Sequence, residues 1–356
     1  MSYSPFRHIS SVFWKGRPIQ LTFFLTKRCN AKCSFCFYQS DRTISEENNL
    51  ELSLGEIERI SASIGNLLWL AFSGGEIFLR NELVEITKVF YERNKPAIIL
   101  FPTNGLLTDV IKEKIEAILK YCRKSTIVVK LSVDGPKSLH DSMRGREGSF
   151  QKTMETYVAL GDLLDEYPNF DLGINTVFCS ANQDRMDEII EYVKGLDNIK
   201  THTVSLIRGR GLTEIDIEKY RKTINRLAEN LKKKVTSIYR FRGARLKAAQ
   251  DIVQRRLIYE TEKQKKKLIN CYAGRLNLVL TETGDLYPCE SFTMKMGNVR
   301  DNGYDIKKIL RSTQAQNILS QIKDNGCFCS HECYLMTNIL FNPRLYPVLL
   351  REYMKI

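Results

Sequence analysis

The sequence predicts an α/β protein built on a parallel sheet, followed by a smaller cysteine-rich region. Three observations carry this prediction. Short apolar runs alternate with amphipathic helical patterns from residue 19 to residue 207, as in consecutive βα units. Polar or glycine-containing motifs follow the apolar runs. Two groups of cysteines stand apart, one at residues 29–36 and the other at residues 271–333.

The predicted strands and helices alternate along the chain. Apolar runs bounded by turn residues predict strands at residues 19–25, 67–72, 97–102, 126–133, 171–178 and 201–207. Apolar residues at helical spacing predict helices at residues 54–64, 81–93, 110–121, 150–164 and 185–195. Two long charged helices, at residues 214–235 and 245–268, are expected to bridge this unit to the second cysteine group.

Length and composition place the chain among ordinary globular proteins. Its 356 residues suit one large α/β domain with an appendage, or two modest domains. Neither a secretory signal nor a stretch long and apolar enough to span a membrane is found, so we expect a cytoplasmic protein. Because the cytosol keeps thiols reduced, the ten cysteines indicate metal binding rather than a disulfide framework.

The net charge of +13 comes mostly from Lys and Arg at residues 232–267. Such runs usually form solvated helix faces, which is the interpretation we favour. Attraction of an anionic substrate, a nucleic acid or a membrane surface is the alternative. No RNA-recognition signature accompanies the basic residues, so nucleic-acid binding is not expected.

The first cysteine group is the segment around which the rest of the chain is interpreted. Cys29, Cys33 and Cys36 stand in a CxxxCxxC spacing directly after an apolar run. Structural zinc takes four closed ligands, whereas cubane iron-sulfur clusters are held by Cys thiolates, so three thiolates leave one iron open to a non-protein ligand. A zinc knuckle or unrelated buried thiols are the alternatives. Cys122 and Cys179, outside both groups, are expected to be ordinary buried thiols.

With the aromatic Phe35 just before its last cysteine, this loop resembles the cluster loop of the radical S-adenosylmethionine (radical SAM) superfamily. The resemblance implies a partial (β/α)6 TIM-like barrel that carries a 4Fe-4S cluster bound by the three cysteines and by SAM. It also implies reductive cleavage of SAM to a 5′-deoxyadenosyl radical, with a reducing partner such as flavodoxin or ferredoxin.

The motifs that follow the predicted strands are expected to gather at one end of such a barrel. The Gly-Gly-Glu at residues 74–76 matches the family's GGE motif, whose backbone and glutamate meet the SAM amino group, and glycine lets backbone approach a ligand closely. Ser132 and Asp134 suit ribose hydroxyls or the SAM carboxylate, and Arg144, in the segment HDSMRG, suits that carboxylate. Common turn dipeptides, a surface arginine and a core asparagine are the ordinary alternatives. The expected SAM contacts are Phe35, Gly74, Gly75, Glu76, Asn104, Ser132, Asp134, Arg144 and Asn175.

The second cysteine group resembles a shortened SPASM domain, or twitch domain. The sequence GDLYPC that ends at Cys289 reproduces the Gly-x4-Cys of these extensions, and its Gly-Asp is expected to turn a hairpin after a strand at residues 276–281. A full SPASM domain has seven cysteines, so the resemblance implies a single auxiliary 4Fe-4S cluster here. Its expected ligands are Cys271, Cys289, Cys333 and one of Cys327 or Cys329, with a structural zinc site as the alternative.

The expected organisation is a barrel at residues 1–212, a basic helical bridge at 213–268, the auxiliary-cluster domain at 269–340 and a tail at 341–356. Residues 335–356 interleave apolar and basic side chains. We expect this segment to form a helix packed on the barrel. The alternative is an interfacial helix that brings the enzyme to a lipid substrate, which would be a peripheral membrane contact.

The resemblance implies an oxidoreductase whose radical removes a hydrogen atom from a substrate, while the auxiliary cluster relays the electron left behind. Only about 20 residues precede the first predicted strand, too few for a leader-peptide-binding domain, so we expect a small-molecule, sugar or lipid-linked substrate, with anionic compounds as candidates. The alternative is modification of a ribosomally made peptide or a protein side chain, by thioether or crosslink formation, epimerisation or oxidation. A non-catalytic iron-sulfur protein and an RNA-binding protein are further alternatives.

Overall fold

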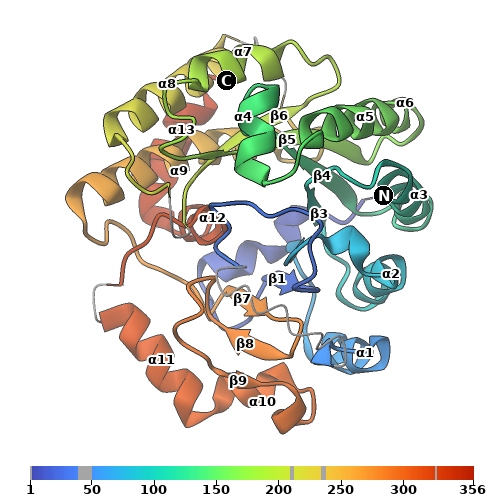
Figure 1. Ribbon diagram of the computed structural model, residues 1–356. Coiled ribbons are helices and arrows are strands. Elements are labelled where there is room, and N and C mark those ends of the chain that lie inside the picture. The colour runs from blue at the N-terminus through green and yellow to red at the C-terminus, as the bar shows by residue number, and fades with distance from the viewer. Residues whose placement is uncertain (1, 39–49, 209–211, 234–237, 325–326) are drawn as a thin grey trace.

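The computed structural model describes residues 2–38, 50–208, 212–233, 238–324 and 327–356. One curved sheet runs through them in the strand order β6-β5-β4-β3-β2-β1-β7-β8-β9. Neighbours among β1 to β6 pair in parallel, which confirms the predicted α/β class and partial (β/α)6 barrel (Figure 1). These strands are β1 (Gln20–Phe24), β2 (Trp69–Ser73), β3 (Ile98–Thr103), β4 (Thr126–Ser132), β5 (Phe170–Phe178) and β6 (Thr201–Leu206).

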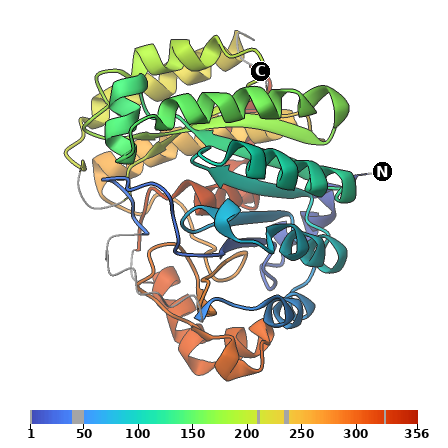
Figure 2. The same cartoon turned by 45° about the vertical axis from the view of Figure 1, so that its right-hand side comes forward.

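Helices cover the outer face of these six strands (Figure 2). They are α1 (Leu54–Ser63), α2 (Leu83–Asn94), α3 (Thr108–Tyr121), α5 (Ser149–Gly161), α6 (Leu163–Glu166) and α7 (Met186–Lys194). The one helix predicted at residues 150–164 is therefore two, since α5 ends at Gly161. The short α4 (Lys137–Arg144) has no predicted counterpart, because its eight residues carry too short an apolar stripe to show helical periodicity.

The two faces of the parallel strands are filled differently, as β4 shows. Ile127, Val129 and Leu131 point outward and belong to the main apolar core under the helices. Lys130 and Ser132 alternate with them and line the inside of the barrel. Because side chains alternate along a strand, one strand can supply both the core and a polar interior.

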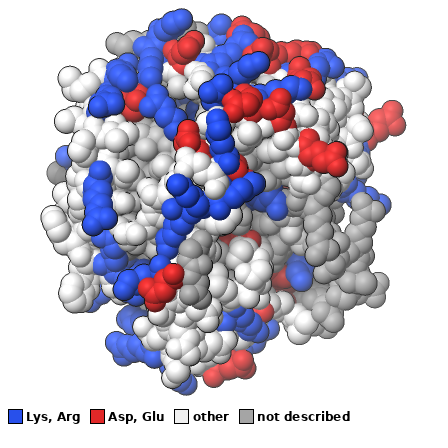
Figure 3. Space-filling model, turned by 90° about the vertical axis from the view of Figure 1, so that its left-hand side faces the viewer, with Lys and Arg blue, Asp and Glu red and all other residues white. Residues whose placement is uncertain are grey.

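The predicted bridging helices are α8 (Ile217–Lys232) and α9 (Ala244–Gln264), and residues 234–235 of the first prediction lie outside the described residues. Tyr259 of α9 donates a hydrogen bond to Glu218 of α8 at 2.7 Å, and Lys263 pairs with the same carboxylate at 3.4 Å. Figure 3 faces the side of the molecule on which these helices lie, where blue basic and red acidic side chains are interspersed. This mixture fits the interpretation of solvated helix faces.

The C-terminal cysteine region continues the barrel sheet instead of forming a sheet of its own. β7 (Asn277–Leu280) pairs in parallel with β1, and turns at Gly284, with φ of 89°, into the antiparallel β8 (Asp285–Tyr287), as the hairpin prediction expects. The short β9 (Gly297–Asn298) and the helices α10 (Ile306–Arg311) and α11 (Thr313–Asp324) follow. The 3₁₀-helices among the described residues are η1 (Pro5–Val12), η3 (Ile77–Leu79), η4 (Arg300–Asn302) and η5 (Pro343–Leu345).

Residues 335–356, which were predicted to form one helix, belong to two: α12 (Glu332–Leu340), which ends before the tail at residues 341–356, and α13 (Tyr346–Tyr353) within that tail. Pro343 lacks a backbone N–H and cannot continue α12, so the chain breaks there. α13 packs against α9, where the buried Glu352 accepts a hydrogen bond from Arg256 at 2.7 Å and pairs with Lys232 at 3.1 Å. Within the described ranges, no helix has both the length and the apolar character needed to cross a membrane.

Candidate cofactor site at the barrel mouth

A cavity of about 390 Å³ lies inside the barrel, at the carboxyl ends of its strands. Cys29, Cys33 and Cys36 all line it, together with the ends of β2 to β5. Of the predicted SAM contacts, only Asp134 is missing from its lining. Those present are Phe35, Gly74, Gly75, Glu76, Asn104, Ser132, Arg144 and Asn175.

The cysteine loop provides thiols whose surroundings suit ligation. Burial raises the pKa of Cys29 to about 11 and also raises the pKa of Cys33, so the free thiols are protonated at neutral pH. Arg144 Nη1 lies 3.7 Å from Cys33 Sγ, and Asn104 Nδ2 lies 3.8 Å from Cys29 Sγ. Such donors stabilise thiolates once metal has displaced the protons, so these residues fit an iron-sulfur cluster.

The glycine pair at residues 74–75 touches the cysteine loop itself. The Gly75 N–H donates to the Thr26 carbonyl at 2.7 Å, and the Glu76 N–H donates to the Arg28 carbonyl at 2.8 Å. A Cβ on Gly75 would lie only 2.0 Å from the Arg28 oxygen, and Gly74 has a φ of 130°. Glycine is therefore needed at these positions for a second reason besides the predicted approach of a ligand, because the two loops pack closely against each other here.

Replacing Gly75 with alanine is therefore expected to displace the cysteine loop, because the clash is with backbone that cannot rotate away. We expect iron bound at this loop to fall several-fold after anaerobic reconstitution. A matched Gly148→Ala variant, at a glycine of positive φ with open space around its Cβ position, should retain its iron. Equal iron in the two variants would show that the contact is not needed.

Glu76 is buried at the bottom of the site with its carboxylate fully engaged. It accepts hydrogen bonds from Thr103 Oγ1 at 2.9 Å, from the Asn104 N–H at 2.9 Å and from the Phe78 N–H at 3.2 Å. Burial outweighs these donors and raises its pKa to about 7. A nearby ammonium group would favour the ionised form.

SAM binding is accordingly expected to weaken as the pH falls through about 7, because a protonated Glu76 cannot pair with an ammonium group. Because one proton is involved, the dissociation constant for SAM should rise by at most about tenfold per pH unit. The stability of SAM-free protein should depend on pH in the opposite direction. Because the pKa of Glu76 is higher in the folded state than its ordinary value of 4.5, this carboxyl stabilises the fold below pH 4.5, and that stabilisation is lost as the pH rises through about 7. Titration calorimetry with SAM on wild type and Glu76→Gln would contradict this if both showed the same pH dependence.

Asp134 does not line the cavity, and its predicted contact with the cofactor stays a prediction. Its side chain is fully buried, and Oδ2 accepts a hydrogen bond from Arg144 Nε at 2.7 Å while Oδ1 accepts one from the Val177 N–H at 2.9 Å. The Arg144 guanidinium also lies 5.3 Å from the centre of the Phe35 ring. Asp134 therefore positions Arg144, which reaches the cavity in its place.

The segment HDSMRG holds the cysteine loop from the other side. The Lys32 N–H donates to the Arg144 carbonyl at 2.9 Å, and the Ser34 N–H donates to the Met143 carbonyl at 3.2 Å. Gly145, with φ of 58°, leaves room for the Lys32 carbonyl, which a Cβ would approach to 2.5 Å. The motif thus supports the loop as well as supplying Arg144.

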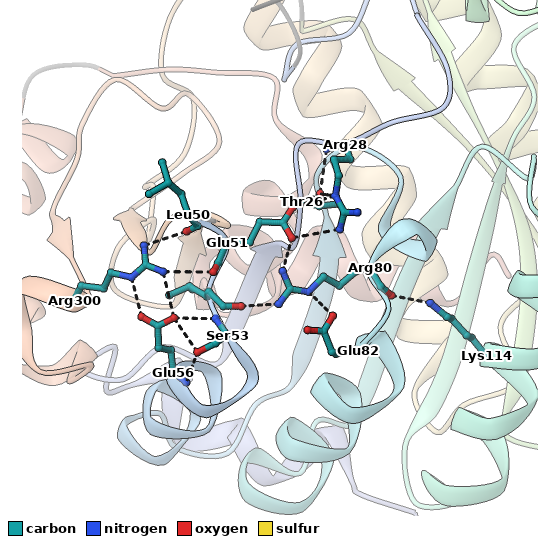
Figure 4. Close-up of polar contacts among 11 residues, drawn as sticks. Thr26, Arg28, Leu50, Glu51, Ser53, Glu56, Arg80, Glu82, Lys114 and Arg300 are labelled. Carbon is teal, nitrogen blue, oxygen red and sulfur yellow. Dashed lines mark hydrogen bonds and ion pairs between the residues drawn. The ribbon is translucent and has the colours of Figure 1, made fainter. Parts of the chain in front are cut away.

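A charged network fixes the base of the same loop to the C-terminal region (Figure 4). The Glu51 carboxylate pairs with Arg80 and, at 3.4 Å, with Arg28 of the cysteine loop. Arg300 donates to Glu56 at 2.8 Å, and this contact lowers the pKa of Glu56 to about 2. Two segments far apart in sequence are thereby joined next to the site.

The second cysteine group divides into two parts. Burial and the neighbouring thiols, Cys327 among them, raise the pKa of Cys271, Cys289 and Cys329. Cys333 instead lines the barrel cavity, where burial raises its pKa to about 12 and the Arg208 guanidinium beside it opposes that rise. The expected ligand set of an auxiliary cluster stays a prediction.

Among the described residues, no three His, Cys, Asp or Glu side chains converge closely enough to hold one metal ion. Structural zinc takes four closed ligands, whereas a cubane cluster takes one thiolate on each iron. The positions of these thiols alone do not decide between zinc and a cluster.

Comparison with known families identifies the family of this chain. The family model of the Radical SAM superfamily matches residues 23–191, which contain the cysteine loop and every predicted SAM contact. The chain belongs to the radical SAM superfamily. A second family model, of the SPASM iron-sulfur cluster-binding domain, matches residues 271–334 and includes all five C-terminal cysteines. Radical SAM domains carry a 4Fe-4S cluster and SAM, and SPASM domains carry auxiliary iron-sulfur clusters. The two family matches therefore confirm the predicted kinds of cofactor.

Relatives of this radical SAM protein include maturation proteins. The antilisterial bacteriocin subtilosin biosynthesis protein AlbA of Bacillus subtilis is 27% identical over 301 residues, which cover 81% of this chain and 59% of AlbA. A cysteine-type anaerobic sulfatase-maturating enzyme of Clostridium novyi is 27% identical over 185 residues, covering 48% of this chain and 46% of that enzyme. The chain spans about half the length of the relatives it matches.

Solved structures support the fold. Streptococcus suis SuiB bound to its precursor peptide SuiA superposes with a TM-score of 0.61 at 14% identity, over 88% of this chain and 70% of SuiB. Native anSMEcpe with bound AdoMet gives a TM-score of 0.58 at 19% identity, over 95% of this chain and 96% of that chain. At these identities the likeness concerns the radical SAM and SPASM fold alone.

Several charged residues of the radical SAM cavity were not predicted from the sequence. Lys130 Nζ lies 3.2 Å from Thr203 Oγ1 inside the barrel, and burial lowers its pKa to about 7. Arg208 pairs with Glu290 at 2.6 Å and with Glu332 at 3.2 Å. The sequence held a hint of each of these residues. Lys130 shares the inward face of its strand with Ser132, and Arg208 directly follows the strand predicted at residues 201–207. Each glutamate stands next to a predicted cluster cysteine. Lys247, Asp251 and Arg255 of α9 also line the cavity, beside the uncharged Gln254, and the sequence held no such hint of them.

Proposed function

We propose that this radical SAM enzyme modifies a side chain of a peptide or protein. The observation that carries the proposal is the similarity to AlbA, which covers 81% of this chain and whose name refers to bacteriocin biosynthesis. A sporulation killing factor maturation protein and sulfatase-maturating enzymes point the same way. These relatives favour the alternative over the small-molecule, sugar or lipid-linked substrate expected from the sequence.

When bound, the cluster and SAM supply one electron and a 5′-deoxyadenosyl radical that removes a hydrogen atom from the substrate. Glu76, already held by three donors, would receive the SAM ammonium group, and Arg144 would pair with the SAM carboxylate. Ser132 and Asn175 line the same cavity and are placed for the remaining polar groups of SAM. These side chains would orient the cofactor inside the cavity.

The other half of the cavity suits a polar substrate segment. Lys130, Asp251 and Arg255 line it from two sides, so both signs of charge are available to backbone amides and polar side chains. Cys333 lines it as well, which would set a ligand of the auxiliary cluster next to the substrate. Were the reaction an oxidation, an auxiliary cluster held in part by Cys333 would supply an acceptor for the electron left on the substrate after its hydrogen atom and a proton are lost.

The test is anaerobic incubation of the reconstituted, reduced protein with SAM and a pool of deuterated synthetic peptides, beside a pool of deuterated sugars and nucleotides. We expect deuterium in 5′-deoxyadenosine with peptides alone, and a peptide mass lowered by the hydrogen removed. Cys333→Ala should still transfer deuterium but release less oxidised product. Deuterium transfer from the sugar or nucleotide pool alone would overturn the proposal.

A further inference from the structure

A second cavity, of about 680 Å³, lies at the opposite end of the barrel from the cysteine loop. Trp69 and Ile98 line it at the amino ends of β2 and β3. The rest of its wall comes from segments far apart in sequence: the N-terminal η1, the start of α9, and the helices α12 and α13. Its lining is almost entirely apolar, with Phe6, Ile9, Leu246, Leu340 and Leu350 among the residues that close it.

The rim of this cavity is unusually apolar for an exposed surface. Ile9 is 65% exposed and Leu350 is 59% exposed, although both line the cavity. More than half of the large hydrophobic side chains exposed in the described ranges belong to these same two terminal segments, namely Phe6, Ile9, Phe13, Trp14, Tyr346, Val348, Leu350 and Met354. A contiguous exposed apolar patch of this kind marks an interaction site.

The charged residues that line the cavity have one sign. They are Arg242, Arg245 and Lys247, and no Asp or Glu lines it. The nearest carboxylates are already paired, Asp251 with Lys247 and Glu352 with Arg256 and Lys232. Arg242 lies 5.6 Å from the Phe6 ring, and Arg245 lies 4.4 Å from the Tyr353 ring and donates to its carbonyl at 3.1 Å. Neither arginine pairs with a carboxylate among the described residues. Both guanidinium groups are thus available to an anion at the mouth of an apolar cavity.

We propose that this cavity takes an acyl chain of an anionic membrane lipid, with Arg242 and Arg245 at its phosphate group. An apolar chain explains the cavity and its exposed rim, and the anionic headgroup explains the excess of basic residues. The protein would then rest on a membrane by the amino-terminal end of its barrel, which leaves the mouth with the cysteine loop accessible. Trp69, Lys247 and Met336 line both cavities, whereas Arg242, Arg245, Ile9 and Leu350 line only this one. Variants at these four residues therefore test this site separately from the proposed chemistry.

The experiment is flotation of the reconstituted full chain with phosphatidylglycerol–phosphatidylcholine vesicles and with pure phosphatidylcholine vesicles. We expect binding to the anionic vesicles alone. Arg242→Gln/Arg245→Gln should weaken it by roughly tenfold or more, and Leu350→Glu should abolish it. The matched control Lys222→Gln/Lys233→Gln removes the same charge from exposed positions on or next to α8 and should bind within about twofold of wild type.

Three results would overturn the proposal. They are equal binding to both vesicle types, equal weakening by the α8 control, and wild-type binding by Leu350→Glu. The fluorescent fatty acid cis-parinaric acid separates a free ligand from a membrane lipid: if it saturates the cavity while no vesicles bind, the site serves a soluble fatty acid and the membrane proposal falls. All variants should keep wild-type iron content and SAM cleavage, so failure here is distinguishable from failure of the proposed function.

Discussion

Alanine at Cys29, Cys33 and Cys36 together is expected to abolish SAM cleavage and remove one of two clusters. The three thiols line one cavity beyond the end of β1, where they would hold the cluster that SAM also ligates. After anaerobic reconstitution, wild type should hold about eight irons and the triple variant about four, since each cubane carries four. The readouts are iron and sulfide content, and 5′-deoxyadenosine formed after dithionite reduction with SAM.

The matched control is the triple variant Cys271→Ala/Cys289→Ala/Cys333→Ala. It should also lose about four irons but retain cleavage of SAM, because these thiols lie in the C-terminal region and not in the loop at the end of β1. If zinc replaced iron in wild type, or if the control lost SAM cleavage as completely as the first variant, the assignment of separate roles to the two cysteine groups would be wrong.

Replacing Arg144 with methionine is expected to cause the largest loss of stability among single substitutions at the site. It leaves the fully buried Asp134 carboxylate with only the Val177 N–H as a partner. Breaking a buried ion pair by removing one member costs about 3–5 kcal/mol, because the remaining charge stays desolvated. Urea unfolding of the cluster-free, reduced protein measures the change in the free energy of unfolding.

A double variant separates the pair from general damage to the site. Asp134→Asn/Arg144→Met removes the uncompensated charge, so it should recover at least about 1 kcal/mol relative to Arg144→Met. Neither variant should bind SAM, since both lack the guanidinium. The exposed neighbour Arg146, changed to methionine, should lose no more than about 1 kcal/mol. No recovery in the double variant would show that Arg144 acts through contacts other than Asp134.

The parts of this protein that the sequence determined are those set by local spacing. The CxxxCxxC spacing of Cys29, Cys33 and Cys36 identified the family, and the period of apolar residues identified the strands β1 to β6. Because the carboxyl ends of parallel strands meet at one edge, residues as distant as Glu76 and Asn175 could be assigned to one cavity. Such predictions need only the chain's own periodicity and a rule of topology.

Contacts between distant segments were decided only by the tertiary structure. The sequence placed Asp134 at the cavity, but both its oxygens are taken by Arg144 and Val177. It gave no reason for Arg208 to join Glu290 and Glu332. The apolar cavity likewise exists only because η1, α9 and α13 pack together at the far end of the barrel. Packing of this kind depends on the combined shapes of segments hundreds of residues apart, and no local pattern encodes those shapes.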